Sequence, residues 1–367
     1  MIPSSGESTR CFAPPRDLPR AYGPAPARGR IKQHSDDFSV EELLGFEPDG
    51  EGPHVWLQIR KRDTNTRWLA GALARLAGVA GRDVGYAGLK DRAAVTTQWF
   101  SVPIEGRRSP DWGAIASAEV EVLRVTRHRK KLRRGVLAGN RFHIRVRGFE
   151  GDTQALESRV RELDANGVPN YFGEQRFGRD SGNVASAWEM LAEGKWVRDR
   201  DRRGLYLSAA RSLLFNHVLA RRVHDGSWRH ALPGEALMLD GSHSVFTLTE
   251  PDADIDGRLA RMDVHPTGPM WGRGEALACG EALALEEAAL AGCSAWCDGL
   301  DAAGLKSARR ALRVPLVELG VAFEATDRLM VSFTLPAGAY ATMAVRELVD
   351  SDQATFLGER AQLFSNT

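Results

Sequence analysis

Cysteine is scarce in this sequence, and the few cysteines form no recognised pattern. Four occur in 367 residues, at Cys11, Cys279, Cys293 and Cys297, with no CxxC pair among them. No histidine stands at ligand spacing from Cys293 and Cys297, so a zinc site is not indicated, and the spacing does not suggest a disulfide framework. The thiols are typical of a reduced set, and we therefore expect a cytoplasmic protein.

Long apolar runs are also missing. No stretch approaches the roughly 18 consecutive apolar residues that a transmembrane helix needs. The N-terminus has no apolar core of the kind that secretory signal peptides carry. We therefore expect no membrane span and no signal peptide. Residues 1–16 are rich in proline, serine and arginine, and we expect them to be flexible.

The sequence lacks the signatures of several large enzyme classes. It contains no Walker phosphate loop, no GxSxG nucleophile elbow and no HExxH zinc motif. The nine histidines show no metal-ligand spacing, and we interpret them as surface or hydrogen-bonding residues. A formal net charge of +1 gives little support for nucleic-acid binding, although a net value hides how the charges are distributed.

Length and patterning place the chain among folded α+β proteins. It is long enough for two domains, and 43% hydrophobic with 26% charged residues is ordinary for a globular protein. Strand and helix patterns mix without a regular βαβ rhythm, which favours an α+β fold over a doubly wound sheet. Strands are predicted over residues 55–59, 95–102, 142–146 and 329–335. Helices are predicted over residues 67–79, 156–163, 208–223, 281–292, 301–313 and 341–349.

Positive charge is concentrated between Leu123 and Val146. This segment has nine lysines and arginines and two histidines, but no aspartate or glutamate. Such a run is costly to fold unless an anion lies against it, and phosphate is the obvious candidate because its neutralisation releases counterions. A solvated basic hairpin is the alternative. The cations are Arg124, Arg127, Arg129, Lys130, Lys131, Arg133, Arg134, Arg141 and Arg145.

Within this run, Asn140, Arg141 and Phe142 combine an amide, a cation and an aromatic ring. Together they suit a nucleotide, because they match its base edge, its phosphate and its base face. Two further cations are candidate phosphate contacts: Arg176, in an aromatic and glycine-rich segment, and Arg211, near a predicted helix start. Structural salt bridges explain either of these two equally well.

The most informative segment covers residues 85–100, where Lys90, Asp91 and Arg92 stand side by side after a glycine-spaced turn. A carboxylate between two cations is favoured in its charged form. Loops between rigid elements often carry chemistry. A charged turn without a function is the alternative. Asp91 is therefore a candidate catalytic residue, and Lys90 is a candidate electrostatic partner.

With these motifs in hand, the chain resembles the TruD family of tRNA pseudouridine synthases. The similarity runs nearly end to end, from about Leu18 to Leu348, and its elements occur in the family's order. No single motif is convincing alone, but so many in one order do not arise by chance. The matching segments are residues 31–32, 37–41, 50–54, 65–66, 85–99, 128–133, 139–142, 170–178, 208–216 and 335–348.

The resemblance implies isomerisation of a specific uridine in tRNA to pseudouridine, at position 13 in the bacterial members, with no cofactor or metal. It also implies a catalytic core with a mixed, largely antiparallel sheet and helices, interrupted by an inserted α+β TRUD domain. The core would occupy residues 1–168 and 301–367, and the insertion residues 169–300. The implied partner is tRNA, and we expect a monomer with no obligate protein partner.

The resemblance also implies roles for individual residues. Asp91 matches the family's catalytic aspartate, and Lys32 and Lys90 match basic residues of its active site. Asn140 and Phe142 match residues that border the target base. The further residues that we expect to contact RNA are Arg129, Lys130, Lys131 and Arg176.

Two mechanisms fit an aspartate. Asp91 attacks the anomeric carbon of the ribose, or it removes the 2′ proton to give a glycal, and the sequence does not choose between them. In both, the uridine leaves its stack, and Phe142 is our candidate for stacking on the flipped base. The alternative function is a noncatalytic RNA-binding or RNA-folding protein on the same fold, which the presence of Asp91 disfavours. Residues 242–263 match the family poorly, so the insertion is less well defined than the core.

Overall fold

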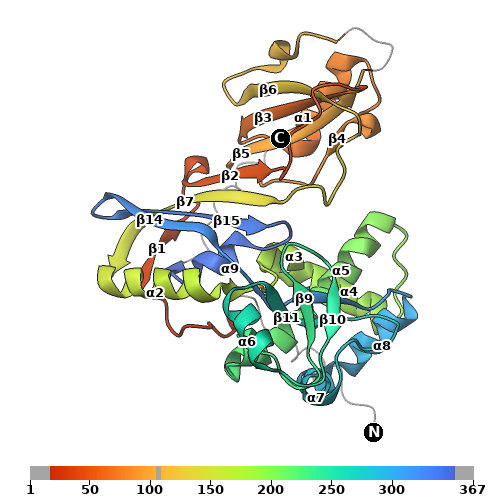
Figure 1. Ribbon diagram of the computed structural model, residues 1–367. Helices are drawn as coiled ribbons and strands as arrows, with labels where there is room; N and C mark the ends of the chain where they lie inside the picture. Colours follow the sequence, from red (N-terminus) through yellow and green to blue (C-terminus); the bar gives the residue numbers. More distant parts are fainter. Residues whose placement is uncertain (1–16, 105–108, 352–367) are drawn as a thin grey trace. The chain divides into compact units, whose positions relative to one another are not determined.

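The computed structural model describes residues 17–104 and 109–351 (Figure 1). Residues 1–16, with Cys11 among them, lie outside the described part of the chain. The expectation that they are flexible therefore stays a prediction. Within the described ranges, no helix is both long enough and apolar enough to cross a bilayer.

The chain forms two compact units, and each is assembled from segments that are distant in the sequence. We call them the sheet unit and the helical unit. The predicted insertion at residues 169–300 falls inside the longest segment of the helical unit, and its exact boundaries stay a prediction. The described residues of the sheet unit are 26–104, 109–160, 316–338 and 349–351, and those of the helical unit are 17–25, 161–315 and 339–348.

The sheet unit is built on one ten-stranded sheet. Its strands are β1 (Ala27–Ile31), β2 (Phe38–Leu43), β3 (His54–Arg62), β4 (Gly85–Tyr86), β5 (Val95–Pro103), β6 (Val120–His128), β7 (Gly139–Gly151), β14 (Val317–Ala325), β15 (Arg328–Pro336) and β16 (Val349–Ser351). The main path runs β14-β15-β7-β2-β5-β3-β6, with β1 pairing β7 and β16, and β4 pairing β5. The β1–β16 and β2–β5 pairs are parallel and the other pairs antiparallel. The prediction of a mixed, largely antiparallel sheet is confirmed.

The central strand β7 follows the alternation read from the sequence. Phe142, Ile144 and Val146 are buried on one face. The alternate residues Arg141, His143 and Arg145 are more exposed, as a period of two residues requires. One strand therefore presents an apolar surface to the core and a row of cations to its other side.

One helix, α1 (Thr66–Ala77), covers part of the sheet (Figure 1). The Asn65 side chain caps it by accepting from the backbone of Arg67 and Trp68, which satisfies amides that the first turn leaves open. Its buried residues Leu69 and Leu73 pack with residues of β3 and β5. The residues of β3 and β5 that face α1 include polar ones at one end, and these form the site described below.

The helical unit combines helices with a four-stranded antiparallel sheet in the order β10-β9-β11-β12. The longest helix, α5 (Arg200–His224), carries much of the apolar core, including Leu213, Phe215 and Val218. The other helices are α3 (Glu174–Phe177), α4 (Gly182–Leu191), α6 (Ala253–Ala260), α7 (Gly280–Leu290), α8 (Ser294–Ala302) and α9 (Ala341–Val345). The strands are β8 (Val168–Pro169), β9 (Ala236–Leu239), β10 (Val245–Thr247), β11 (Val264–Met270), β12 (Ala308–Ala311) and β13 (Arg313–Val314). Helix α2 (Thr153–Asn166) includes residues of both units.

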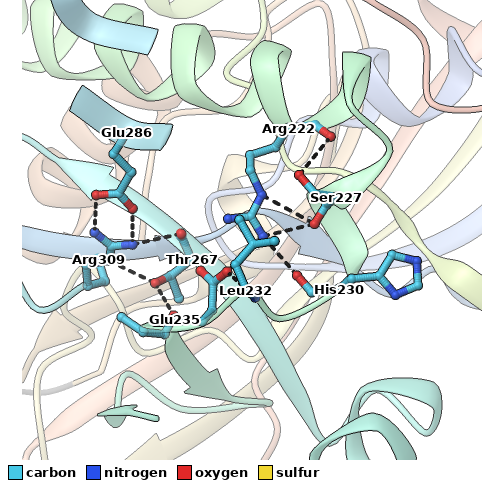
Figure 2. A network of polar contacts seen from close by, with 9 residues as sticks. Arg222, Ser227, His230, Leu232, Glu235, Thr267, Glu286 and Arg309 are labelled. Carbon is cyan, nitrogen blue, oxygen red and sulfur yellow. Dashed lines mark hydrogen bonds and ion pairs between the residues drawn. The ribbon is translucent and has the colours of Figure 1, made fainter. Parts of the chain in front are cut away.

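Two buried ion pairs of the helical unit, Arg222–Glu235 and Arg309–Glu286, lie close together (Figure 2). Arg222, near the end of α5, contacts Glu235 at 2.8 Å, and both side chains are almost completely buried. Its guanidinium also donates to the carbonyls of Ser227 and His230. These additional hydrogen bonds offset part of the cost of removing the pair from water. The pair therefore fixes the end of α5 against the start of β9.

Three predicted elements differ from the structure. Ser208 does not begin a helix, because α5 starts eight residues earlier, at Arg200, with Asp199 as its cap, so the assignment of Arg211 to a helix start was wrong. Residues 301–313 were predicted to be helical, but α8 ends at Ala302 and β12 follows. The last helix ends at Val345 rather than near 349, where β16 begins.

Candidate active site

Asp91 lies in the loop between β4 and β5, with a side chain that is 38% exposed. Its Oδ2 atom is 2.8 Å from Nζ of Lys32, which follows β1 directly. The Lys32 ammonium also lies 4.0 Å from the centroid of the Phe38 ring, a cation–π contact. The cation that touches Asp91 therefore comes from 59 residues earlier in the chain.

Lys32 has an unusual backbone conformation, with a φ of 57°. Few residues other than glycine adopt the left-handed region, and those that do concentrate at functional sites. In this conformation the side chain leaves the end of β1 and reaches both Asp91 and Phe38. The strain at Lys32 supports a functional role for the ion pair.

Lys90 does not contact its neighbour Asp91 through an ion pair. Its Nζ atom is 2.8 Å from Oε1 of Glu42, whose side chain is completely buried. The other carboxylate oxygen of Glu42 accepts from the backbone of Trp99 at 2.8 Å. Burial raises the pKa of Glu42, and the attraction of Lys90 opposes this rise. Arg92 donates to the carbonyl of Asp63, so neither neighbour in the sequence holds Asp91 as the triplet had suggested.

The backbone of the loop is held by two buried side chains. Thr66 Oγ1, at the first turn of α1, accepts from the Lys90 amide at 3.2 Å and donates to Gln98 at 3.0 Å. The Gln98 amide then donates to the carbonyl of Gly88 at 2.7 Å. Residues 88–90, which lead directly into Asp91, are thus attached to both α1 and β5.

Strand register places a row of five side chains on one face of the sheet, next to the Asp91 loop's anchors on α1 and β5. Lys61 of β3 lies opposite Thr96 of β5, and Thr96 lies beside Val40 of β2. Val40 lies opposite Phe142 of β7, which in turn lies opposite Phe333 of β15. Because side chains alternate between faces, this row continues the surface that α1 covers farther along the strands.

Phe142 and Asn140 stand on this face, as their shared strand requires. Phe142 is only 7% exposed, and its ring lies 6.1 Å from that of Phe38 and 5.5 Å from that of Phe333. The carbonyl oxygen Oδ1 of Asn140 is buried and has no hydrogen-bond partner among the residues that the structure describes. Buried acceptors without a partner are rare, so this oxygen is suited to receive a donor from a ligand.

The basic run forms β6, the start of β7 and the segment between them. Carboxylates from elsewhere in the sheet unit neutralise part of it, which corrects the expectation that an external anion is needed for it to fold. Among the described residues, no carboxylate forms an ion pair with Lys130, Lys131, Arg133 or Arg134. The neutralising pairs are Arg124–Glu47, Arg129–Glu51, Arg141 with Glu41 and Glu318, and Arg145 with Asp37 and Glu324.

Arg176 belongs to the helical unit, on α3. Its guanidinium donates to the hydroxyls of Tyr340 and Ser208, each at 2.9 Å, and lies 5.4 Å from the Phe172 ring centroid. Arg211 donates to the backbone carbonyls of Met270 and Lys306. The hydrogen bonds of Arg211 stabilise the helical unit itself, and its role as a phosphate contact gains no support.

Sequence reasoning missed four residues of the site: Glu42, Lys61, Thr66 and Gln98. A signal for two of them was present, because Glu42 and Lys61 occupy inward positions in alternating strands whose other inward residues are apolar. An ionisable group at such a position is buried unless the strand ends. In the described ranges, no cluster of three or more His, Cys, Asp or Glu side chains is placed to hold a metal ion.

Lys61 carries a prediction of its own. Its side chain is 1% exposed, its ammonium donates to the Thr64 carbonyl at 2.8 Å, and burial together with the nearby Lys90 lowers its pKa to about 8. Because the pKa is lower in the folded than in the unfolded chain, stability should rise as the pH increases from about 8 toward the usual lysine value. Lys61→Met should remove this rise and increase the free energy of unfolding near pH 7 by about 2 kcal/mol. Urea unfolding at several pH values tests this, and an unchanged pH profile in the variant would contradict it.

The sequence and the fold of this chain are both similar to those of known proteins. A profile of the family described as "TruD: tRNA pseudouridine synthase D" matches residues 21–200 and 197–348. The tRNA pseudouridine synthase D of Methylococcus capsulatus is 51% identical over 336 residues, covering 92% of this chain and 95% of that protein. The one from Nitrosococcus oceani is 49% identical, covering 91% and 94%. A solved TruD chain from Methanosarcina mazei shares the fold, with a TM-score of 0.66 at 22% identity over 95% of this chain and 98% of that chain.

Proposed function

Because this chain belongs to the tRNA pseudouridine synthase D (TruD) family, we propose that it converts a uridine of tRNA, at position 13, into pseudouridine with Asp91 as the catalytic residue. The observation that carries the proposal is the Asp91–Lys32 ion pair. Further support comes from the Lys32 ammonium, which also lies over the Phe38 ring, because that ring lies 6.1 Å from the ring of Phe142. A carboxylate is the one group that the reaction requires.

The reaction moves one bond from nitrogen to carbon. Asp91 attacks C1′ of the ribose, or it removes the 2′ proton, and the electron pair of the N1–C1′ bond leaves with the uracil. The uracil rotates and its C5 atom bonds to C1′, which breaks the C1′–O bond to Asp91 in the first route and is accompanied by return of the proton from Asp91 to C2′ in the second. The C5 proton is then lost and N1 becomes protonated. In both routes a negative charge passes from Asp91 to the uracil. Lys32, which is released when Asp91 loses its charge, is placed to stabilise the uracil anion electrostatically.

The other residues of the site bind the substrate in this proposal. Phe142 borders the flipped base, and the unpartnered Oδ1 of Asn140 accepts from the base edge. Lys90 contributes positive charge beneath the loop. The residues proposed to contact RNA phosphates are Arg129, Lys130, Lys131 and Arg176. We further propose that the enzyme acts as a cytoplasmic monomer on tRNA alone and uses no cofactor.

Incubation of the purified protein with tRNA transcripts, followed by mapping of pseudouridine, tests the proposed function. We expect one pseudouridine, at position 13, and release of tritium from tRNA labelled at C5 of uridine. Modification at a different position would contradict the assigned position while keeping the reaction. Tight tRNA binding without any pseudouridine would instead favour a noncatalytic RNA-binding protein on this fold.

Neutralising part of the basic run should weaken tRNA binding and reduce its salt dependence. In the variant Arg129→Gln/Lys130→Gln/Lys131→Gln, the slope of log affinity against log salt should fall by roughly one for each phosphate that the protein no longer neutralises. Arg129 contributes least, because Glu51 already pairs with it. Binding measured at several salt concentrations gives the slope. Lys195→Gln, an exposed lysine of the helical unit paired with Glu189, is the control, and equal slopes for both variants would remove the run from the RNA interface.

A further inference from the structure

The loop that leads to Asp91 is not stabilised by regular secondary structure. Residues 87–93 lie outside regular strand or helix, so no ladder of backbone hydrogen bonds defines their conformation. A catalytic carboxylate nevertheless has to be held closely, because a displacement of about 1 Å can lower a reaction rate about 100-fold. The interactions that position this loop should therefore be visible as side chains that bind its backbone.

Two such side chains form a continuous chain of hydrogen bonds. The Lys90 amide donates to Thr66 Oγ1, the Thr66 hydroxyl donates to Gln98 Oε1, and the Gln98 amide nitrogen donates to the Gly88 carbonyl. Both backbone groups belong to the segment immediately before Asp91. Thr66 and Gln98 thus bind the loop backbone at two points only two residues apart, the Lys90 amide and the Gly88 carbonyl.

Both side chains are themselves rigidly placed. Thr66 is 1% exposed and Gln98 is completely buried. Thr66 is the first residue of α1, directly after its Asn65 cap, and Gln98 is on β5, paired with Ile59 of β3. A polar pair buried this deeply is stabilising only when its hydrogen bonds are made, and here each partner completes the other's.

We propose that Thr66, acting together with Gln98, is a positioning residue for catalysis, which couples the packing of α1 on the sheet to the placement of Asp91. The inference rests on the proposed function, because Asp91 has to be the group that reacts. Thr66 itself touches neither the uridine nor the ribose. Its hydroxyl both accepts and donates, a combination that serine can reproduce and valine cannot.

Thr66→Val keeps the shape of the side chain and removes the hydroxyl. We expect the single-turnover rate of pseudouridine formation to fall about 10- to 100-fold, with the tRNA dissociation constant within about threefold of the wild-type value. Thr66→Ser should restore most of the rate. If the valine variant does not fold, Thr66→Ala serves in its place.

A matched control separates positioning from a general loss of stability. Ser101 is also a completely buried hydroxyl on β5, and it accepts from the Leu132 amide rather than from the Asp91 loop. Ser101→Ala should lower the melting temperature to a similar extent but leave the rate nearly unchanged. An equal loss of rate in the Ser101 variant, or an unchanged rate in Thr66→Val, would overturn the proposal.

Hydrogen exchange tests the geometry without relying on activity. The Lys90 amide should exchange faster in Thr66→Val than in the wild type or in Thr66→Ser, and Ser101→Ala should leave it unchanged. Unaltered exchange of this amide in Thr66→Val would refute the role of Thr66. A wild-type protein that forms no pseudouridine in any tRNA would instead refute the proposed function, so the two failures are distinguishable.

Discussion

Replacing Asp91 by asparagine should abolish pseudouridine formation and leave tRNA binding largely intact. The asparagine amide keeps the size of the side chain but neither attacks C1′ nor accepts the 2′ proton. Loss of a single group that acts directly in the chemistry commonly lowers the rate by about 10⁴-fold or more. Tritium release from labelled tRNA measures turnover, and a binding assay on the same tRNA measures affinity.

The Asp91→Asn variant should still be folded. Asp91 is 38% exposed but Lys32 only 12%, so the Lys32 ammonium depends on the amide oxygen of the new asparagine as its acceptor, and the expected loss of stability is about 1–2 kcal/mol. Asp36→Asn is the matched control, because Asp36 is a half-exposed carboxylate of the sheet unit that pairs with Arg62. We expect the control to retain full turnover. Appreciable turnover by Asp91→Asn would remove Asp91 from its catalytic role.

Replacing Lys90 by methionine should produce the largest loss of stability among the variants of this site. The change leaves the completely buried carboxylate of Glu42 without its cation. Removing one partner of a buried ion pair typically costs about 3–5 kcal/mol. Burial already raises the pKa of Glu42, and the variant should raise it further. Since a raised folded-state pKa gives stability that is lost as the pH increases through it, the loss of stability relative to the wild type should be larger above the raised pKa of Glu42 than below it. Urea unfolding across a range of pH measures both effects.

A second substitution tests the cause of that loss. Adding Glu42→Gln to Lys90→Met removes the unpaired charge, so stability should largely recover and its dependence on pH should weaken. We expect low turnover in both the single and the double variant, because both lack the positive charge of Lys90. Arg60→Met is the control for losing a cation from an exposed pair, with Glu121, and should cost less than about 1 kcal/mol. A Lys90 variant no less stable than this control would contradict the prediction.

Much of the sheet unit is predictable because its strands alternate. Phe142, Ile144 and Val146 define an inward face by themselves, and the helix after Asn65 is marked by its cap and its apolar spacing. Prediction fails where local propensity competes with packing. Residues 301–313 are rich in alanine and leucine, yet β12 pairs there with β11, because a partner strand supplies hydrogen bonds that propensity does not count. Ser208 is a good cap in isolation, but Asp199 caps α5 instead.

The candidate site also has features that can be predicted from consecutive residues and features that depend on packing. By itself, the sequence determined the class of fold, the family, and the segments that carry Asp91, Asn140 and Phe142, since each of these is readable from consecutive residues. Which groups meet depends on how the chain folds. The tertiary structure pairs Asp91 with Lys32 rather than Lys90, and Lys90 with Glu42.

The physical reason is that ion pairs and buried hydrogen bonds depend on distance in space, whereas a sequence gives only distance along the chain. A triplet such as residues 90–92 in an extended loop sends its side chains in different directions. Lys32, Glu42, Thr66 and Gln98 reach the loop only because β1, β2, α1 and β5 converge there. Which charge is balanced, and which backbone groups are held, follows from that convergence.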